Sequence, residues 1–133
     1  MGHPRLRSVV LDTTDVPRLA EFYRFLLGWS YPEGYDIDAF TDWRVVVGPG
    51  GERLAFQEVA ELPPTTWPTA EVPQQVHLDL IVDTRDDLEE SHRRALELGA
   101  VVRLDRSEDP EEPLRVYADP AGHTFCLFTH DVG

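Results

Sequence analysis

A histidine and an aspartate stand where a β-strand would point both toward the same side. His77 and Asp79 are separated by one residue in the apolar run Val76–Val82, and alternate residues of a strand share a face. On that face, Asp79 could orient the imidazole ring or act as a base. The alternative, equally open, is a partly exposed carboxylate near the end of a strand. His77 itself is expected to contact a ligand or water, or to serve a structural role, ahead of binding a metal ion.

The single cysteine, Cys126, lies in the apolar segment Thr124–Phe128. A thiol becomes nucleophilic when a neighbouring base or cation lowers its pKa, and no basic group stands beside Cys126 in the sequence. A small buried apolar side chain is therefore the favoured interpretation. A lone cysteine also excludes an internal disulfide, so the fold does not depend on an oxidising compartment.

Aromatic and polar residues near strand ends are the candidate walls of a ligand cavity. Trp43 and Phe40 flank the start of a predicted strand beside an irregular loop, where aromatic rings could stack a flat ligand. Asp12 and Asp79 are predicted on the cavity side, which favours a cationic ligand. Trp67 is expected either to close the cavity or to pack between the halves of the chain. By contrast, His92 is expected on a solvated face of a charged helix.

The charge balance excludes several function classes. The 133 residues include 25 acidic side chains against 12 basic ones, for a net charge of −13, and every basic residue is an arginine. Without lysine there is no Schiff-base chemistry and no P-loop. The acidic excess argues against nucleic acid or an anionic membrane as partner. No apolar run approaches the ~20 residues of a membrane-spanning helix, so a soluble, cytoplasmic protein is expected.

The elements that must position these residues recur twice along the chain. In each half a strand is followed by a helix that ends at a glycine, Gly28 or Gly99, and then by about three strands. Ser8 aligns with His77 at a shift of 69 residues, whereas the glycines align at a shift of 71. Aligning Asp15 with Asp86 in the same way assigns the two-residue difference to the turn between strand and helix. The predicted strands are 6–12, 42–47, 53–59, 76–82, 101–105, 114–118 and 124–128, with a short strand and a loop in 29–40 and a second helix over 84–98.

The predicted fold is α+β, with two βαβββ modules that form a cupped mixed β-sheet in one domain. Each helix must cover one face of its sheet, which leaves the other face free to line a cavity. Alternation places Ser8, Gln57, His77 and Cys126 near the middle of that cavity. The predicted boundaries are repeat 1 at about 5–60, a proline-rich bridge at 61–74 and repeat 2 at about 75–130.

Five motifs follow one another in a characteristic order: Glu21-Phe22-Tyr23, Leu27-Gly28-Trp29, His77-Leu78-Asp79-Leu80, Leu98-Gly99-Ala100 and Asp119-Pro120-Ala121-Gly122-His123. On these motifs the chain resembles the vicinal-oxygen-chelate superfamily, which includes glyoxalase I, extradiol dioxygenases, fosfomycin-resistance enzymes and bleomycin-resistance proteins. The resemblance covers nearly the whole chain and implies the paired βαβββ fold and a homodimer. The segment Phe125-Cys126-Leu127 and the stretch from Trp67 through Gln75 to His77 resemble the uncharacterised glyoxalase-like branch more than glyoxalase I.

The resemblance also implies where a metal ion would bind. Enzymes of this superfamily hold a divalent ion with side chains from four strands, and the ion acts as a Lewis acid on a chelating substrate. The matching positions here are Ser8, Gln57, His77 and Cys126, of which His77 matches well and Gln57 is tolerable. Serine is a poor ligand for hard divalent ions, and a single thiolate with a neutral amide makes a weak zinc site.

The favoured function is therefore a small-molecule binding protein that sequesters a planar or hydrophobic compound without a catalytic metal. The alternative is a lyase, isomerase or dioxygenase-like enzyme that uses a divalent ion on His77 and Gln57. The remaining ligand contacts are expected from Trp43, Asp79, Asp12, Phe40 and Cys126. A regulatory domain with a vestigial cavity is a third hypothesis.

Overall fold

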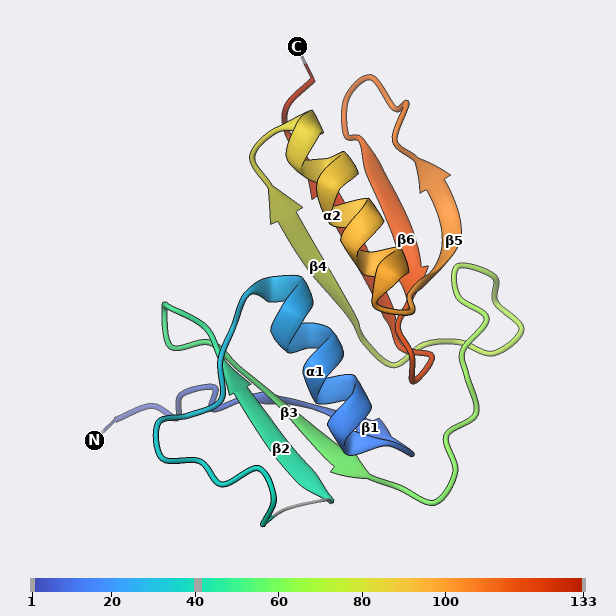
Figure 1. The fold of residues 1–133 in the computed structure, drawn as a ribbon. Coiled ribbons are helices and arrows are strands. Elements are labelled where there is room, and N and C mark those ends of the chain that lie inside the picture. Colours follow the sequence, from blue (N-terminus) through green and yellow to red (C-terminus); the bar gives the residue numbers. More distant parts are fainter. Residues whose placement is uncertain (1, 40–41, 133) are drawn as a thin grey trace. The chain divides into compact units, whose positions relative to one another are not determined.

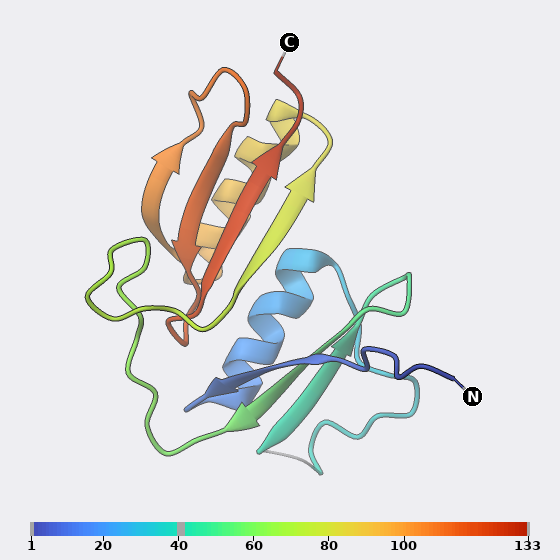
Figure 2. The ribbon, with the colours of Figure 1, turned by 180° about the vertical axis from the view of Figure 1, so that it is seen from behind.

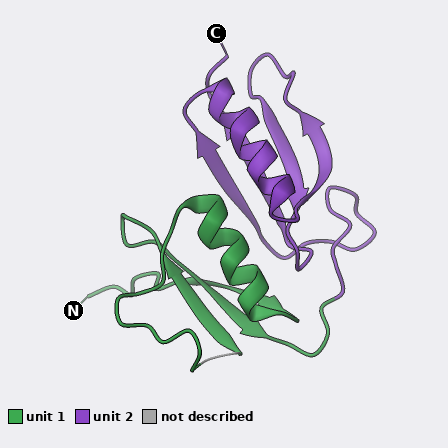
Figure 3. Cartoon of the chain, in the orientation of Figure 1, with its two compact units in different colours: residues 1–62 green, residues 63–133 purple. Residues whose placement is uncertain are grey.

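The computed structural model describes residues 2–39 and 42–132, so the predicted ligand contact Phe40 lies outside the described residues. The chain divides into two compact units, Met1–Leu62 and Pro63–Gly133 (Figure 3). Each unit contains one helix and one mixed sheet, which confirms the α+β class and the two-module organisation. The boundary between the units falls within the predicted proline-rich bridge 61–74, and residues 63–74 belong to the second unit. Among the described residues, neither helix combines the length and the apolar character needed to cross a bilayer.

The first unit is built from β1 (Val9–Thr13), α1 (Val16–Leu27), β2 (Trp43–Val47) and β3 (Arg53–Glu58). Its strand order is β1-β3-β2, with β1 parallel and β2 antiparallel to the central β3. The short strand expected in 29–40 is not formed: the described residues there contribute one isolated bridge, from Ser30 to Val47.

Local signals account for the position of α1. The Asp15 carboxylate accepts a hydrogen bond from the Arg18 N–H at 3.2 Å, and Pro17 stands in the first turn, where a missing N–H costs little. Gly28 ends the helix with φ 69°, a left-handed conformation that favours glycine. The buried face of α1 comprises Val16, Leu19, Ala20, Phe22, Tyr23 and Leu26.

The second unit is built from β4 (His77–Val82), α2 (Arg85–Glu97), β5 (Val101–Arg106), β6 (Leu114–Ala118) and β7 (Thr124–Thr129). Its strand order is β4-β7-β6-β5, in which β4 and β7 are parallel and the other pairs antiparallel. This half therefore has the complete βαβββ order that the sequence predicts.

The two helices align differently from the sequence prediction. Their N-cap residues are Asp15 and Thr84, which differ by the same 69 positions as Ser8 and His77. The two-residue difference therefore falls at the helix C-terminus, not in the preceding turn. There, α2 has 13 residues against 12 in α1 and is followed by Leu98 before the glycine. The glycines misled the alignment because a helix can lengthen before its C-terminal glycine without changing which face packs on the sheet.

Each helix lies on one face of its own sheet, in front of the strands in Figure 1 and behind them in Figure 2. In the second unit the helix side of the sheet includes Phe125 and Leu127, which are buried. Arg115 is the register partner of Leu127, and its guanidinium reaches Glu89 on α2 at 2.9 Å. Asp79 is exposed on the opposite face, which confirms the predicted alternation along β4.

Candidate functional site

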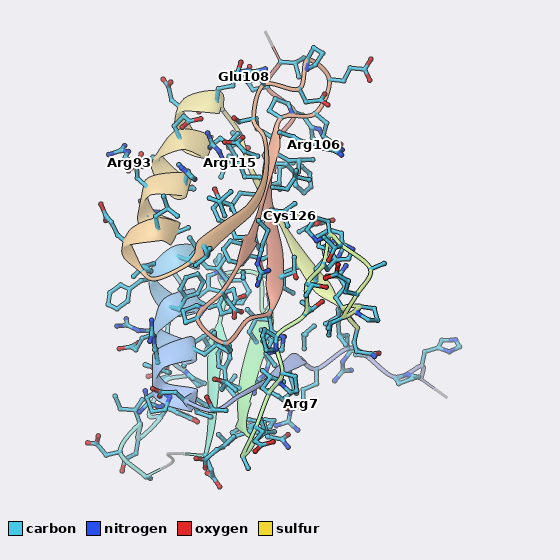
Figure 4. All side chains as sticks on the ribbon, turned by 90° about the vertical axis from the view of Figure 1, so that its right-hand side faces the viewer. Arg7, Arg93, Arg106, Glu108, Arg115 and Cys126 are labelled. Atoms are coloured by element: carbon cyan, nitrogen blue, oxygen red, sulfur yellow. The ribbon has the colours of Figure 1, made fainter. Side chains whose placement is uncertain are left out.

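Strands β4 and β7 bring three of the predicted site residues together. His77 and Asp79 are alternate residues of β4, and Asp79 is the register partner of Cys126 on the parallel strand β7. One ligand atom from each residue lies within 4.8 Å of the other two. We call His77, Asp79 and Cys126 the β4–β7 cluster; Figure 4 labels Cys126 on its strand. All three side chains belong to the sheet face away from α2, because alternate residues share a face and register partners lie side by side.

Two polar contacts hold the histidine ring. The side-chain amide nitrogen of Gln74 lies 3.0 Å from His77 Nδ1, and His77 Nε2 lies 3.2 Å from Asp79 Oδ1. An amide and a carboxylate therefore flank the two ring nitrogens. This agrees with the interpretation in which Asp79 orients the imidazole, and the 56% exposure of the Asp79 side chain agrees with the alternative as well.

An indole ring covers the imidazole. Trp67 stacks on His77, with the ring centroids 4.9 Å apart and the planes inclined by 16°. The backbone N–H of Trp67 donates to the Thr65 hydroxyl at 3.1 Å, and this anchors the residue within its loop. The stack leaves Asp79 accessible, since 56% of its side chain is exposed. A carboxylate beside a flat aromatic pair is suited to a planar ligand that carries a positive charge or donates hydrogen bonds.

Cys126 is the buried member of the cluster. It is 6% exposed, and burial, together with the negative charge and hydrogen bonding of Asp79, raises the pKa of its thiol to about 11. At neutral pH the group is therefore a thiol that hydrogen-bonds to Asp79, and it is a poor nucleophile. This confirms the prediction that Cys126 is a small buried side chain.

The donor set of the β4–β7 cluster also fits a thiophilic divalent ion. Imidazole nitrogen, thiolate sulfur and carboxylate oxygen are the ligands of zinc sites. With bonds of about 2.0–2.3 Å, tetrahedral ligand atoms lie roughly 3.3–3.8 Å apart, so atoms already within 4.8 Å of one another need to move little. Binding would have to remove the proton from the Cys126 thiol, whose pKa is raised to about 11, which makes it dependent on pH.

The first unit brings together a different set of predicted residues. Asp12 is the register partner of Gln57, and Gln57 is the register partner of Trp43, so the three form one row across β1, β3 and β2. Gln57 is exposed, whereas Asp12 and Trp43 are half-buried. We call this set the Asp12 row. It groups an acid, an amide and an indole on the face away from α1.

Ser8 does not join that row. The β1–β3 ladder pairs Val9 with Leu54, so its continuation by one residue sets Ser8 opposite Arg53, four residues before Gln57. At about 3.3 Å per residue, this offset separates Ser8 from Gln57 by roughly 13 Å along the sheet. In the second unit Thr124 lies opposite His77, only two residues before Cys126. Ser8 and Gln57 therefore cannot share a ligand in the way that His77 and Cys126 can.

Sequence reasoning missed two features around the helices and the cluster. The amide of Gln74 holds His77, but a glutamine in a proline-rich segment carries no signal of that contact. The expectation that His92 is solvated is wrong: its Nδ1 lies 2.7 Å from the Tyr117 hydroxyl, and burial lowers its pKa. Aligning the helices on their N-caps would have placed His92 over the buried Tyr23 and so revealed its position.

Comparisons with known proteins agree with this architecture. A family model described as "Glyoxalase-like domain" matches residues 8–128. None of the curated proteins compared with the chain matches it. Solved structures with very different sequences share the fold. One is a glyoxalase/bleomycin resistance protein/dioxygenase family enzyme from Burkholderia phytofirmans, 16% identical, with a TM-score of 0.71 over 93% of this chain and 97% of that one.

Two further solved structures are similar to the chain. A hypothetical protein from S. aureus is 17% identical, with a TM-score of 0.73 over 96% of this chain and 95% of that one. A fosfomycin resistance protein from Listeria monocytogenes, complexed with Mn(II) and 1S,2S-dihydroxypropylphosphonic acid, is 15% identical. Its TM-score is 0.70 over 99% of this chain and 92% of that one. At these identities the likeness concerns the fold.

Proposed function

The chain belongs to the glyoxalase-like domain family, and on that premise we propose that it binds a planar, hydrogen-bonding or cationic small molecule without a catalytic metal. The family match and the similar solved structures agree with the vicinal-oxygen-chelate superfamily that the sequence motifs predict. The observation that carries the proposal is the set of polar contacts within and beside the β4–β7 cluster. Gln74, His77, Asp79 and Cys126 contact one another in series, next to a stacked indole.

The protonation of the cluster favours binding over metal catalysis. A divalent ion competes with a proton on a thiol whose pKa is raised to about 11. Neutral pH therefore lies roughly four pH units below the pH at which the thiol ionises without a metal ion. The carboxylate of Asp79 is already engaged with both neighbours. A neutral ligand donor or an organic cation needs only the exposed part of Asp79 and the face of Trp67, and it displaces no proton.

A metal-dependent lyase, isomerase or dioxygenase-like enzyme is the second candidate, and the ligand geometry of the cluster favours it. His77 Nε2, Asp79 and the Cys126 sulfur would hold the ion. A bound divalent ion supplies a Lewis acid that stabilises negative charge on a substrate oxygen. Asp79 would then bind the ion instead of orienting the ring, and Gln74 would remain the partner that fixes His77 through Nδ1. Gln57, the other predicted ligand, belongs to the Asp12 row.

Titration with planar dyes of opposite charge tests the proposal. We expect proflavine, a planar cation, to quench tryptophan fluorescence saturably, and 8-anilinonaphthalene-1-sulfonate, a planar anion, to bind at least about tenfold more weakly. Asp79→Asn should weaken proflavine binding by about tenfold. The matched control is Asp83→Asn, which removes an exposed carboxylate just beyond β4. Trp67→Phe should remove most of the quenching. This result would show that Trp67, and not one of the other two tryptophans, reports the binding of the dye.

Metal analysis separates the two candidates. Protein purified without an affinity tag should contain a substoichiometric amount of divalent metal, unchanged by His77→Ala. A stoichiometric ion that is lost in His77→Ala, together with equal dye binding by the Asp79→Asn and Asp83→Asn variants, would overturn the binding proposal and favour the enzyme.

We also propose that the chain forms a homodimer, as the family resemblance implies. Ile81 and Val101, on the face away from α2, are 56% and 60% exposed, and apolar side chains at such positions are suited to a subunit interface. Light scattering coupled to gel filtration tests this directly, with twice the 15.1 kDa chain mass as the expected result and the monomer mass as the contrary one.

A further inference from the structure

The first unit contains a cavity that neither the Asp12 row nor the β4–β7 cluster uses. It has a volume of about 450 Å³ and lies between the segment that precedes β1 and the turn that connects β2 to β3. Arg7, labelled in Figure 4, comes from that segment. The residues that give the cavity its character are His3, Arg5, Leu6, Arg7, Gly51 and Arg53.

The cavity concentrates positive charge in a strongly acidic chain. Three of its lining residues are arginines, whereas the whole chain has 12 basic residues and a net charge of −13. Over residues 2–39 and 42–132, the ion pairs of the protein involve other arginines, so Arg5, Arg7 and Arg53 face no carboxylate. Like charges gathered without a counter-charge repel one another, and an anion in the cavity would relieve that repulsion.

The position of Arg53 supports the same conclusion. Its Nε is buried and has no hydrogen-bond partner among the described atoms, which is costly for a donor on a cation. The neighbouring acid does not compensate: Glu52 is exposed, does not line the cavity, and directs its carboxylate to Gly50 in the turn. An oxyanion bound by the terminal N–H groups of Arg53 would offset part of this cost.

We propose that this cavity binds a phosphoryl group, as the free diphosphate anion or as the diphosphate end of a larger compound. Guanidinium groups present paired N–H donors that match the oxygen spacing of phosphate, and three of them balance the charge of a diphosphate. Gly51, with φ 89°, contributes backbone without a side chain to the lining of the cavity. The site lies within the first unit and does not depend on the function proposed for the β4–β7 cluster.

Calorimetric titration of the untagged full chain with inorganic phosphate, diphosphate and ADP at low salt tests the site. We expect diphosphate to bind at least about tenfold more tightly than phosphate, and salt to weaken it. ADP that binds more tightly than diphosphate would identify a larger compound as the ligand, whereas equal affinities would identify the free anion. The absence of saturable binding by both diphosphate and ADP at millimolar concentration would overturn the proposal.

Substitutions that remove arginine charge at the cavity and away from it separate a site from a general field effect. Arg53→Gln and the double variant Arg5→Gln/Arg7→Gln should each weaken diphosphate binding by about tenfold or more. Arg93→Gln, on the exposed side of α2, is the charge-matched control for Arg53→Gln and should leave binding within about twofold. Arg53→Lys should recover part of the loss because it restores charge without the paired donors. Equal weakening by Arg93→Gln would overturn the proposal, and unchanged thermal unfolding of the double variant excludes a folding defect.

Discussion

The two units share a chain order but differ in which polar side chains meet. Ser8 and Gln57 have the same sequence separation as His77 and Cys126. In the second unit the β4–β7 ladder sets Cys126 within ligand distance of His77. In the first, the β1–β3 ladder is offset by two further residues and places Asp12 beside Gln57 instead. Strand register, rather than spacing along the chain, therefore decides whether a repeated pair of positions forms a site.

The cores of the units differ as well. Helix α1 buries six side chains on its sheet, whereas α2 buries only Leu88 and Ala95. The second unit compensates with polar contacts on the helix side of its sheet, where Arg115 lies between Glu89 and Asp105, and His92 contacts Tyr117. We therefore expect the first unit to depend on apolar packing and the second on hydrogen bonds and charge.

The largest expected effect tests that contrast at equivalent helix positions. Tyr23 is fully buried and stacks on Phe56 at 5.9 Å, so Tyr23→Ala should lower the free energy of unfolding by about 4 kcal/mol. His92→Ala, 69 residues on, removes one hydrogen bond from a partly exposed ring and should cost about 1 kcal/mol. Urea denaturation measures both. Equal losses would show that the units do not differ in their dependence on packing.

The reactivity of Cys126 should change by a factor that follows from its pKa. Burial and Asp79 raise that pKa from 9.0 to about 11, so the native thiolate fraction is about 100-fold below that of the unfolded chain. Alkylation by iodoacetamide at about pH 8 should therefore be at least about 100-fold slower in native protein than in urea. The native pKa of Cys126 is higher than the unfolded one, so the protonated thiol contributes to the stability of the folded protein. This contribution is complete below about pH 9 and is lost as the pH rises towards 11.

Asp79→Asn provides the control for that measurement. It removes the nearby negative charge but keeps the side chain's size, so the thiol should react faster than in the parent protein while the fold is retained. Native alkylation as fast as that of the unfolded chain would contradict the buried, protonated thiol on which the proposed function relies.

A smaller effect should distinguish two buried arginines on the helix sides of the two sheets. Arg115 pairs with carboxylates at 2.9 and 3.1 Å, whereas Arg44 donates to the Tyr31 hydroxyl at 3.0 Å and the Ile37 carbonyl at 3.3 Å. Arg115→Ala should cost about 2 kcal/mol and less in 1 M salt. Arg44→Ala should cost about 1–2 kcal/mol with little dependence on salt. Urea titrations with and without salt measure both losses. A salt-dependent loss for Arg44→Ala and a salt-independent loss for Arg115→Ala would contradict this distinction between the two arginines.

The smallest expected effect is the acid dependence that Asp105 gives to the second unit. Hydrogen bonds from Ser107, followed by the Arg115 contact, lower the pKa of Asp105 to about 2. Because the native pKa lies below the unfolded one, the stabilisation is present above about pH 4 and is lost as the pH falls towards 2. Asp105→Asn should flatten this part of the stability curve. If the free energy of unfolding of the variant still fell as steeply between about pH 4 and pH 2, the role given to Asp105 would be contradicted.

The sequence predicts the elements and faces well and the contacts between strands poorly. Alternation in the apolar runs places His77 and Asp79 on the correct face, because one face of each sheet must pack against a helix. The ladder offset that separates Ser8 from Gln57 has no local signature, since it depends on backbone pairing between distant segments. The same holds for the cavity arginines, because Arg53 lies almost 50 residues after Arg5 and Arg7 in the sequence and yet lines the same cavity.

The two-residue difference between the ladders has a further consequence for how a repeated chain can diverge. Side chains alternate with a period of two, so a slip by an even number of residues returns every side chain to its original face. An apolar core therefore survives such a slip, while each residue on the exposed face acquires new neighbours. In this protein, Leu54 and Phe56 still pack beneath α1 although Gln57 lies beside Asp12. An even offset therefore brings different surface residues together in the two halves while the same faces of the strands pack in the interior.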